Sequence, residues 1–246
     1  MKLEQAVILA GGKGERLRPL TDHLPKPMVP VLDKPFLDYL IGSMVAVGIK
    51  RVLLLVGYRG EKIIEYYKNF RHPRCEIDFS VGAVEDQTGR RLLNAYDKLE
   101  KNFLLAYGDN YWPIDIAGMT RLYEEKGAKV SATVFSNKNG TSEYGPENNV
   151  EVGPDHFIKR YDKTRKSRDM NGVDIGYFIV DKGILDPESK SNASFEENVL
   201  PPLIAQSNLI GYLTDRQYYY ITNVPSLRNF EAFVTAKRVS SLIPGS

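Results

Sequence analysis

The stretch AVILAGGKGERLRPLTDHLPKPMVP, residues 6–30, decides the fold of this chain. It opens with five apolar residues, the pattern of a short buried strand. The glycine-rich segment 11–14 follows at once, so the backbone can turn tightly and its free N–H groups can form an anion-binding nest. Cations come next on short spacing, among them Arg16 and Lys26. The stretch therefore predicts a polyphosphate site at the end of a strand.

Two other phosphate-binding loops fit this stretch less well. A dinucleotide-binding loop needs a third small residue, and Leu17 stands at that position. A Walker A loop needs Ser or Thr after its lysine, but Lys13 is followed by Gly14. A purely structural glycine turn stays open for residues 12–14 taken alone. The whole stretch, with its glycines and cations together, favours a ligand site.

Composition places the chain among ordinary globular proteins. It has 246 residues, of which 42% are hydrophobic and 26% charged, enough for one α/β domain with a full core. The net charge of +2 argues against a nucleic-acid partner bound through a broad basic face. A small anion held by a local group of cations remains compatible with it.

Cysteine content and hydropathy indicate where in the cell the protein is expected. The single cysteine, Cys75, allows no intrachain disulfide. We find no apolar run as long as a membrane span and no signal-peptide core at the N-terminus. We therefore expect a cytoplasmic protein with no membrane partner.

Strand and helix patterns alternate along the first part of the chain. This order predicts a doubly wound, mostly parallel α/β sheet, in which ligands bind beyond the carboxyl ends of the strands. The predicted strands are 6–10, 51–56, 76–81, 103–107, 129–135, 150–152, 157–161 and 173–180. The predicted helices are 35–48, 61–69, 92–99, 114–126, 195–206 and 226–242.

A second candidate site residue follows a later strand. The apolar run 103–107 ends in Gly108-Asp109, which would place a carboxylate at the edge of the sheet that also holds the glycine turn. Carboxylate and phosphate oxygens are the ligands that Mg²⁺ prefers. Asp109 is therefore predicted to bind Mg²⁺, against the simpler interpretation of a turn residue.

The residues quoted so far resemble the signature of a known family. Segment 9–21, with Gly11, Gly12, Gly14 and Arg16, and Pro-Lys-Pro-Met at 25–28 are similar to the sugar-1-phosphate nucleotidyltransferases. That family joins a nucleoside triphosphate to a sugar 1-phosphate and releases pyrophosphate. The resemblance is specific over roughly the first 110 residues and looser afterwards. It implies a Rossmann-like, glycosyltransferase-A-like single domain, with a nucleotide-binding part at 1–112 and a sugar-phosphate-binding part at 113–246.

The resemblance also implies roles for individual residues. It makes Arg16 and Lys26 catalytic and Asp109 the ligand of a Mg²⁺ cofactor. The implied nucleotide-binding residues are Leu9, Ala10, Gly11, Gly12, Gly14, Gln87, Thr88 and Gly89. The implied sugar-phosphate-binding residues are Tyr144, Gly145, Lys163, Asp174 and Glu196. Two alternatives stay open: Thr88 as an ordinary helix N-cap, and Glu196 as an acidic residue complementing a helix dipole.

Two places in the later part of the chain depart from the family pattern. Asp174 stands where asparagine is common, and a carboxylate accepts hydrogen bonds but cannot donate them. Relatives carry a second metal-binding aspartate near the end of the chain, where this sequence has no carboxylate in 218–225. Asn223 could supply a neutral oxygen there, Asp109 could act with phosphates and waters alone, or catalysis could be impaired.

The expected function is therefore the transfer of a nucleoside monophosphate to a sugar 1-phosphate, for surface-polysaccharide synthesis. The elements at 88–89 and 195–196 favour CTP or GTP as the nucleoside triphosphate. Two alternatives stand beside it: a catalytically weak regulatory paralogue that binds a nucleotide sugar, and a cytidylyltransferase acting on phosphocholine. The sequence leaves the sugar open and also leaves open a homo-oligomer.

Overall fold

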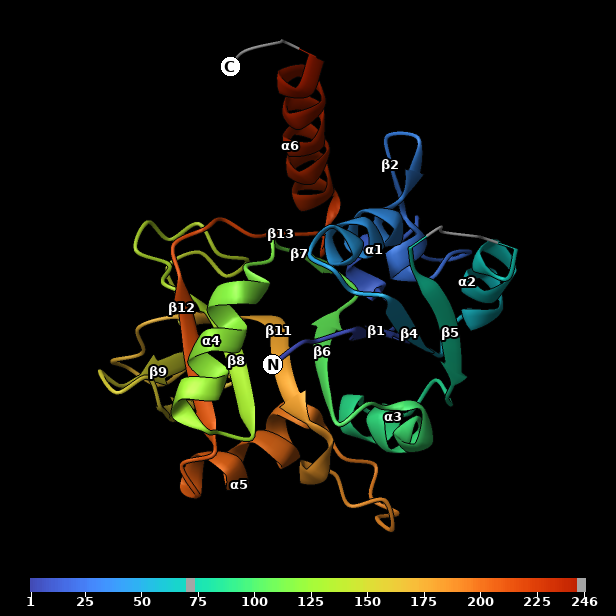
Figure 1. Ribbon diagram of the computed structural model, residues 1–246. Coiled ribbons are helices and arrows are strands. Elements are labelled where there is room, and N and C mark those ends of the chain that lie inside the picture. Colours follow the sequence, from blue (N-terminus) through green and yellow to red (C-terminus); the bar gives the residue numbers. More distant parts are fainter. Residues whose placement is uncertain (70–73, 243–246) are drawn as a thin grey trace.

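The computed structural model describes residues 1–69 and 74–242, with side chains as far as Lys237. One seven-stranded sheet runs through the molecule in the order β12-β8-β11-β6-β1-β4-β5 (Figure 1). Only β11 is antiparallel to its neighbours. In chain order these strands are β1 (Gln5–Ala10), β4 (Arg51–Val56), β5 (Glu76–Val81), β6 (Asn102–Tyr107), β8 (Val130–Phe135), β11 (Val173–Asp181) and β12 (Leu209–Thr214). The expected mostly parallel, single-domain α/β fold is confirmed.

Strand β1 is central because it is apolar on both sides. Its successive side chains point to opposite faces of the sheet. Ala6 and Ile8 therefore join one hydrophobic core, while Val7 joins the other. A strand buried on both faces is typical of a sheet covered by helices on each side.

The helices divide between those two faces. The core that contains Ile8 also holds apolar side chains of α1, α2, α4 and α6, while the core that contains Val7 holds those of α3 and α5. Figure 1 shows α3 and α5 together, away from α1 and α2. The helices are α1 (Phe36–Ala46), α2 (Gly60–Tyr67), α3 (Thr88–Asn94), α4 (Ile116–Lys126), α5 (Leu200–Ala205) and α6 (Val224–Leu242).

Short elements complete the fold. Three small two-stranded sheets pair β2 (Pro30–Val31) with β3 (Lys34–Pro35), β7 (Asn110–Tyr111) with β13 (Tyr219–Tyr220), and β9 (Val150–Val152) with β10 (Ile158–Tyr161). Single 3₁₀ turns lie at Glu15–Leu17, Lys26–Met28, Tyr96–Lys98 and Lys182–Ile184, and a π-helical turn at Phe195–Val199 leads into α5.

The structure differs from the sequence-based elements at three places. Helix α3 begins at Thr88, four residues earlier than predicted, and ends at Asn94. Strand β12 was not predicted, although it forms an edge of the main sheet beside β8. Segment 218–225 was expected to carry a late strand, but only the two residues of β13 pair, and they pair with β7 outside the main sheet.

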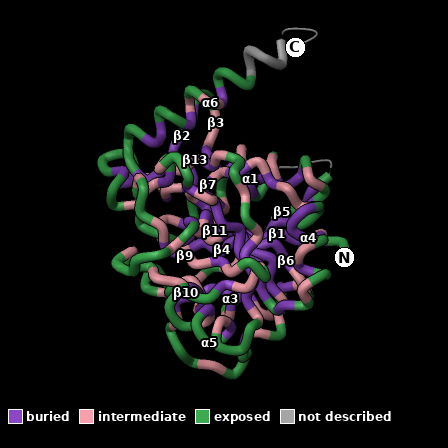
Figure 2. Tube along the Cα trace, turned by 90° about the vertical axis from the view of Figure 1, so that its left-hand side faces the viewer, coloured by how far each residue is buried: buried purple, intermediate pink, exposed green. Residues whose placement is uncertain are grey.

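Helix α6 projects from the body of the molecule (Figures 1 and 2), and as far as Lys237 its buried residues lie between Ser226 and Val234. Phe230 anchors it and is completely buried. Its ring centroid lies 5.0 Å from that of Phe36, 5.5 Å from that of Tyr39 and 5.1 Å from that of Tyr111. Aromatic contacts at such distances add to the effect of burying apolar area.

We expect Phe230→Ala to lower the free energy of unfolding by about 3–5 kcal/mol, because the change leaves a cavity among three aromatic rings. Chemical denaturation with urea measures this loss. Arg228→Ala, an exposed change on the same helix, is the control and should change stability by less than about 0.5 kcal/mol. Similar losses in the two variants would show that α6 is not anchored through Phe230.

Candidate active site

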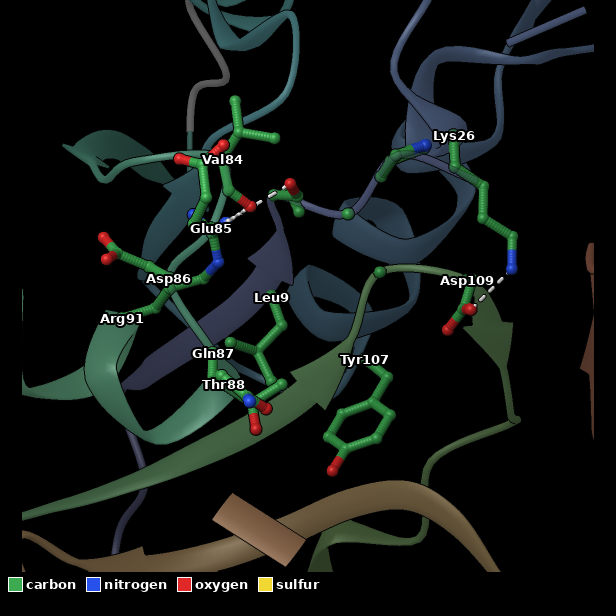
Figure 3. Close-up of a pocket in the computed structure, with 15 residues that line it drawn as sticks. Leu9, Lys26, Val84, Glu85, Asp86, Gln87, Thr88, Arg91, Tyr107 and Asp109 are labelled. Atoms are coloured by element: carbon green, nitrogen blue, oxygen red, sulfur yellow. Dashed lines mark hydrogen bonds and ion pairs between the residues drawn. The ribbon is translucent and has the colours of Figure 1, made fainter. Parts of the chain in front are cut away.

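A pocket of about 390 Å³ opens where β1 and β6 end (Figure 3). The turn after β1 lines it together with segment 84–88, which leads from β5 into α3. Figure 3 shows Lys26 and Asp109 on one side of this pocket and Val84 and Arg91 on the other. The predicted nucleotide-binding residues that line it are Leu9, Ala10, Gly11, Gly12, Gln87 and Thr88.

The glycine turn has two kinds of glycine. A Cβ on Gly12 would meet nothing within 4 Å, so this residue leaves its backbone open. Gly14 has a φ of +66°, the left-handed region that favours glycine. A Cβ on Gly14 would also lie 2.8 Å from the Cβ of Lys26. Gly14 therefore lets the turn close on Lys26 and does not itself line the pocket.

Lys26 and Asp109 form an ion pair at the edge of the pocket. The Lys26 Nζ donates to Asp109 Oδ2 over 2.6 Å, and the two side chains are 11% and 34% exposed. Lys26 begins the 3₁₀ turn Lys26–Met28, and Asp109 follows β6. A backbone hydrogen bond of 3.1 Å from Ile221 N–H to Asp109 O ties the late segment of the chain to this point.

Thr88 and Gly89, two of the predicted nucleotide-binding residues, have different surroundings. Thr88 lines the pocket, and its hydroxyl donates to Glu196 Oε2 over 2.8 Å and accepts the Phe195 N–H over 2.8 Å. It is the first residue of α3, whose N-cap is Gln87, so the alternative of Thr88 as an N-cap is wrong. Gly89 packs against segment 193–195, because a Cβ there would lie 2.7 Å from Ala193 O.

Glu196 is a buried carboxylate in the first turn of the π-helical segment Phe195–Val199. It accepts hydrogen bonds from the hydroxyls of Tyr107, Thr88 and Ser194. Burial acts to raise the pKa of Glu196, but the hydrogen bonds, led by that of Tyr107, hold it below its ordinary value. Glu196 is therefore an ionised acceptor that reaches the pocket wall through Thr88 and Tyr107.

Asp174 lies near Glu196, but its pKa is shifted in the opposite direction. Its Oδ1 accepts the Gly176 N–H and its Oδ2 the Tyr161 hydroxyl, each over 2.8 Å. Burial raises the pKa of Asp174 to about 6, and the charge of Glu196 adds to this rise. The two carboxylates therefore differ in protonation below about pH 6, where Asp174 is largely protonated and Glu196 is ionised.

The raised pKa of Asp174 predicts a pH effect on stability. The folded protein binds more protons than the unfolded chain between pH 4 and 6, so Asp174 lowers stability as the pH rises through this window. We expect Asp174→Asn to gain stability relative to the wild type across that window, by about 3 kcal/mol. Urea unfolding of both proteins at several pH values measures this difference. A difference independent of pH would place the Asp174 pKa at its ordinary value.

Arg16 is held from the other half of the chain. Its Nη1 lies 3.3 Å from Glu143 Oε1, which also accepts the Thr222 hydroxyl over 2.7 Å. Glu143 precedes the predicted sugar-binding pair Tyr144 and Gly145. The ion pair therefore links the phosphate-binding turn to the segment expected to cover the sugar.

Tyr144 and Lys163, two further predicted sugar-phosphate-binding residues, each contact one charged side chain. The ring of Tyr144 lies 3.8 Å from the guanidinium carbon of Arg165. Lys163 is half exposed, and its Nζ lies 3.6 Å from Glu197 Oε1. Lys163 thus contacts Glu197, the residue that follows Glu196 in the chain. Both side chains of this ion pair are about half exposed, so the pair does not fix Lys163 firmly.

The late segment that lacks an aspartate holds no replacement carboxylate of its own. Ile221 is completely buried and Thr222 is bonded to Glu143. Asn223 Oδ1 accepts the Ser226 N–H over 2.9 Å, so this oxygen caps the start of α6. In the part of the chain that the structure describes, no three metal-ligating side chains gather at one point.

Sequence reasoning missed Glu143 and Arg91. Glu143 lies 127 residues from Arg16 in the chain, and no local sequence pattern predicts their contact. Arg91 had a signal, because it follows the Thr88-Gly89 element by two residues, but it was not singled out. It lines the pocket and is almost completely buried.

Comparison with known proteins decides between the families weighed above. The sequence profile described as nucleotidyl transferase matches residues 5–236. The chain belongs to the nucleotidyl transferase family. It is 30% identical over 224 residues to the D-glycero-alpha-D-manno-heptose 1-phosphate guanylyltransferase of Aneurinibacillus thermoaerophilus, covering 90% of this chain and 94% of that protein.

Two other relatives agree with this assignment. The probable glucose-1-phosphate cytidylyltransferase of Bacillus subtilis is 29% identical over 248 residues, with 92% of both chains covered. The crystal structure of HddC from Yersinia pseudotuberculosis has the same fold, with a TM-score of 0.77, 21% identity, and coverage of 94% of this nucleotidyltransferase and all of that chain. The resemblance to sugar-1-phosphate nucleotidyltransferases is confirmed.

No helix in the described residues is long and apolar enough to cross a membrane.

Proposed function

We propose that this nucleotidyltransferase transfers a nucleoside monophosphate from CTP or GTP to a sugar 1-phosphate and releases pyrophosphate. One observation carries the proposal: a glycine turn, the Lys26 ammonium and the Asp109 carboxylate meet at one pocket. A pocket of that composition suits two polyanions. Product use in surface-polysaccharide synthesis is part of the proposal.

The chemistry needs no activated nucleophile. A sugar 1-phosphate oxygen is already anionic near neutral pH and attacks the α-phosphorus in line as pyrophosphate leaves. The protein contributes by holding two mutually repelling anions and by neutralising charge on the leaving group. Lys26 holds the reacting phosphates, Arg16 holds the leaving pyrophosphate, and Lys163 holds the phosphate of the sugar.

Asp109 fits a Mg²⁺ ion bound together with the triphosphate. Its Oδ2 is bonded to Lys26, while its Oδ1 has no protein partner among the described residues. One carboxylate with phosphate and water oxygens is a usual way to bind Mg²⁺. When bound, the ion would neutralise phosphate charge, and Asp109 would set its position.

Pyrophosphate release tests the proposal. The protein is incubated with MgCl₂, each of CTP, GTP, UTP and ATP, and a panel of sugar 1-phosphates that also includes phosphocholine. We expect release with one nucleotide and one sugar 1-phosphate. Release only with phosphocholine would support the non-sugar alternative. Nucleotide-sugar binding without any release would support the regulatory alternative, which the lack of a carboxylate in 218–225 favours.

A further inference from the structure

Arg91 is a buried cation that joins the ends of three strands. It lies on α3 and its side chain is 5% exposed. Its Nη1 donates to Val56 O at the end of β4 over 3.0 Å. Its Nη2 donates to Ala83 O over 2.9 Å, and to Gly11 O and Val84 O over 3.4 Å each. One guanidinium thus connects the turns after β1, β4 and β5.

Three glycines make room for this guanidinium. A Cβ on Gly11 would lie 2.3 Å from the Arg91 Cζ, and one on Gly57 would lie 2.5 Å from its Nη1. A Cβ on Gly82 would lie 2.7 Å from Asp86 Oδ2 and 3.2 Å from the same Nη1. These glycines follow three different strands, so the close fit around Arg91 is a feature of the tertiary structure. We call Gly11, Gly57 and Gly82 the guanidinium cage.

Arg91 donates its hydrogen bonds to carbonyl oxygens, while the carboxylates of Asp86 and Glu85 favour its charge through space. Among residues 1–69 and 74–237 no carboxylate forms an ion pair with it. Asp86 is nearby, but its Oδ2 accepts the Ala83 N–H over 2.8 Å and the Asn94 amide over 2.9 Å. Arginine stays charged even when buried, so its hydrogen bonds to carbonyls are of the charge-assisted, stronger kind. Such bonds fix the backbone of the turns that accept them.

Those turns form one side of the pocket. Gly11 and Val84 line it, and so does Arg91 itself, whereas Lys26 and Asp109 stand across it (Figure 3). The predicted sugar residues Asp174 and Lys163 do not line this pocket. An effect of Arg91 on pocket shape should therefore reach the nucleotide and not the sugar 1-phosphate.

We propose that Arg91 is a positioning residue that keeps the nucleotide side of the pocket in its binding shape, with the guanidinium cage serving Arg91. The inference rests on the proposed function for the identity of the ligand. If the turns were ordered only a tenth of the time without Arg91, the apparent Kd would rise about tenfold. The affinity for sugar 1-phosphate would not change.

The binding test uses Arg91→Met, with Arg91→Lys as a second variant in case the first does not fold. The probes are CTP, GTP, UTP and ATP with MgCl₂, titrated one by one by calorimetry without sugar phosphate. We expect Arg91→Met to raise the Kd of the bound triphosphate about tenfold and to leave the KM of the sugar 1-phosphate within about twofold. Arg91→Lys, with one compact donor group, should give a smaller increase.

Arg90→Met is the matched control. Arg90 is the preceding residue, and its Nη1 donates to Ser189 O over 2.9 Å, on the segment that packs behind α3. We expect it to bind the triphosphate as the wild type does. Wild-type affinity in Arg91→Met, or equal losses for triphosphate and sugar 1-phosphate, would overturn the positioning role.

A stability cycle tests the cage without reference to any ligand. Gly57→Ala does not alter a pocket-lining residue, and it should lower the melting temperature of the wild type because its Cβ overlaps Arg91 Nη1. In the Arg91→Met background the loss should shrink by at least half. Equal losses in both backgrounds would overturn the cage. A wild type that binds none of the four triphosphates would overturn the nucleotide role together with the proposed function, while this cycle would still judge the cage.

Discussion

Lys26→Met should lower kcat by about a hundredfold or more, the size of effect seen when a preorganised charge-stabilising group is removed. Methionine keeps most of the side chain's length and apolar stem, so the change removes the ammonium with little loss of packing. The physical reason is that Lys26 is only 11% exposed, and an ammonium shielded from water acts strongly on phosphate charge. Steady-state pyrophosphate release with the nucleotide and sugar 1-phosphate that the substrate panel identifies measures the effect.

Lys62→Met is the control for this prediction. Lys62 is an exposed residue of α2, outside the residues that line the pocket. It should keep wild-type kcat and KM. Wild-type turnover in Lys26→Met would remove Lys26 from the catalytic machinery, whatever its contact with Asp109.

Asp109→Asn should abolish the Mg²⁺-dependent part of the rate while the fold stays intact. A neutral amide oxygen is a weaker ligand for Mg²⁺ than a carboxylate, and the change also removes the charged partner of Lys26. We expect activity to fall by on the order of a hundredfold at a Mg²⁺ concentration that saturates the wild type. Titration of MgCl₂ in the activity assay measures the loss, and circular dichroism checks the fold.

A second measurement separates metal binding from charge balance. Mg²⁺ should raise the melting temperature of the wild type in the presence of triphosphate, and it should do so much less in Asp109→Asn. Asp97→Asn, an exposed carboxylate after α3, is the control and should respond as the wild type does. An unchanged Mg²⁺ response in Asp109→Asn would exclude Asp109 as the metal ligand.

Arg16 and Lys26, the two cations predicted to contact the triphosphate, are already paired with carboxylates in the ligand-free protein. Arg16 is 63% exposed, so its pair with Glu143 contributes at most about 1 kcal/mol and is easily exchanged for a phosphate. The pair of Lys26 with Asp109 is more buried and therefore harder to separate. We infer that a triphosphate displaces Glu143 from Arg16 but joins Lys26 and Asp109 as a third member.

Periodicity and local chemistry predicted the first half of the fold well. The strands at 51–56 and 76–81 begin and end where they were expected, because each is a continuous or alternating pattern that no tertiary contact had to override. Prediction was weaker in the second half. Strand β12 at Leu209–Thr214 is as long as those two strands, but it is defined by parallel pairing with β8, a partner far away in the sequence.

The sequence by itself determined the family, the glycine turn, and the residue types that meet phosphate. Only the tertiary structure decided which charges meet: Lys26 with Asp109 across 83 positions, and Arg16 with Glu143 across 127. It also decided that three glycines surround Arg91 and that Asp174 titrates at a different pH from Glu196. The physical reason is range. Backbone conformation and hydrophobic period are properties of neighbouring residues, whereas burial and ion pairing depend on which distant segments the sheet brings together.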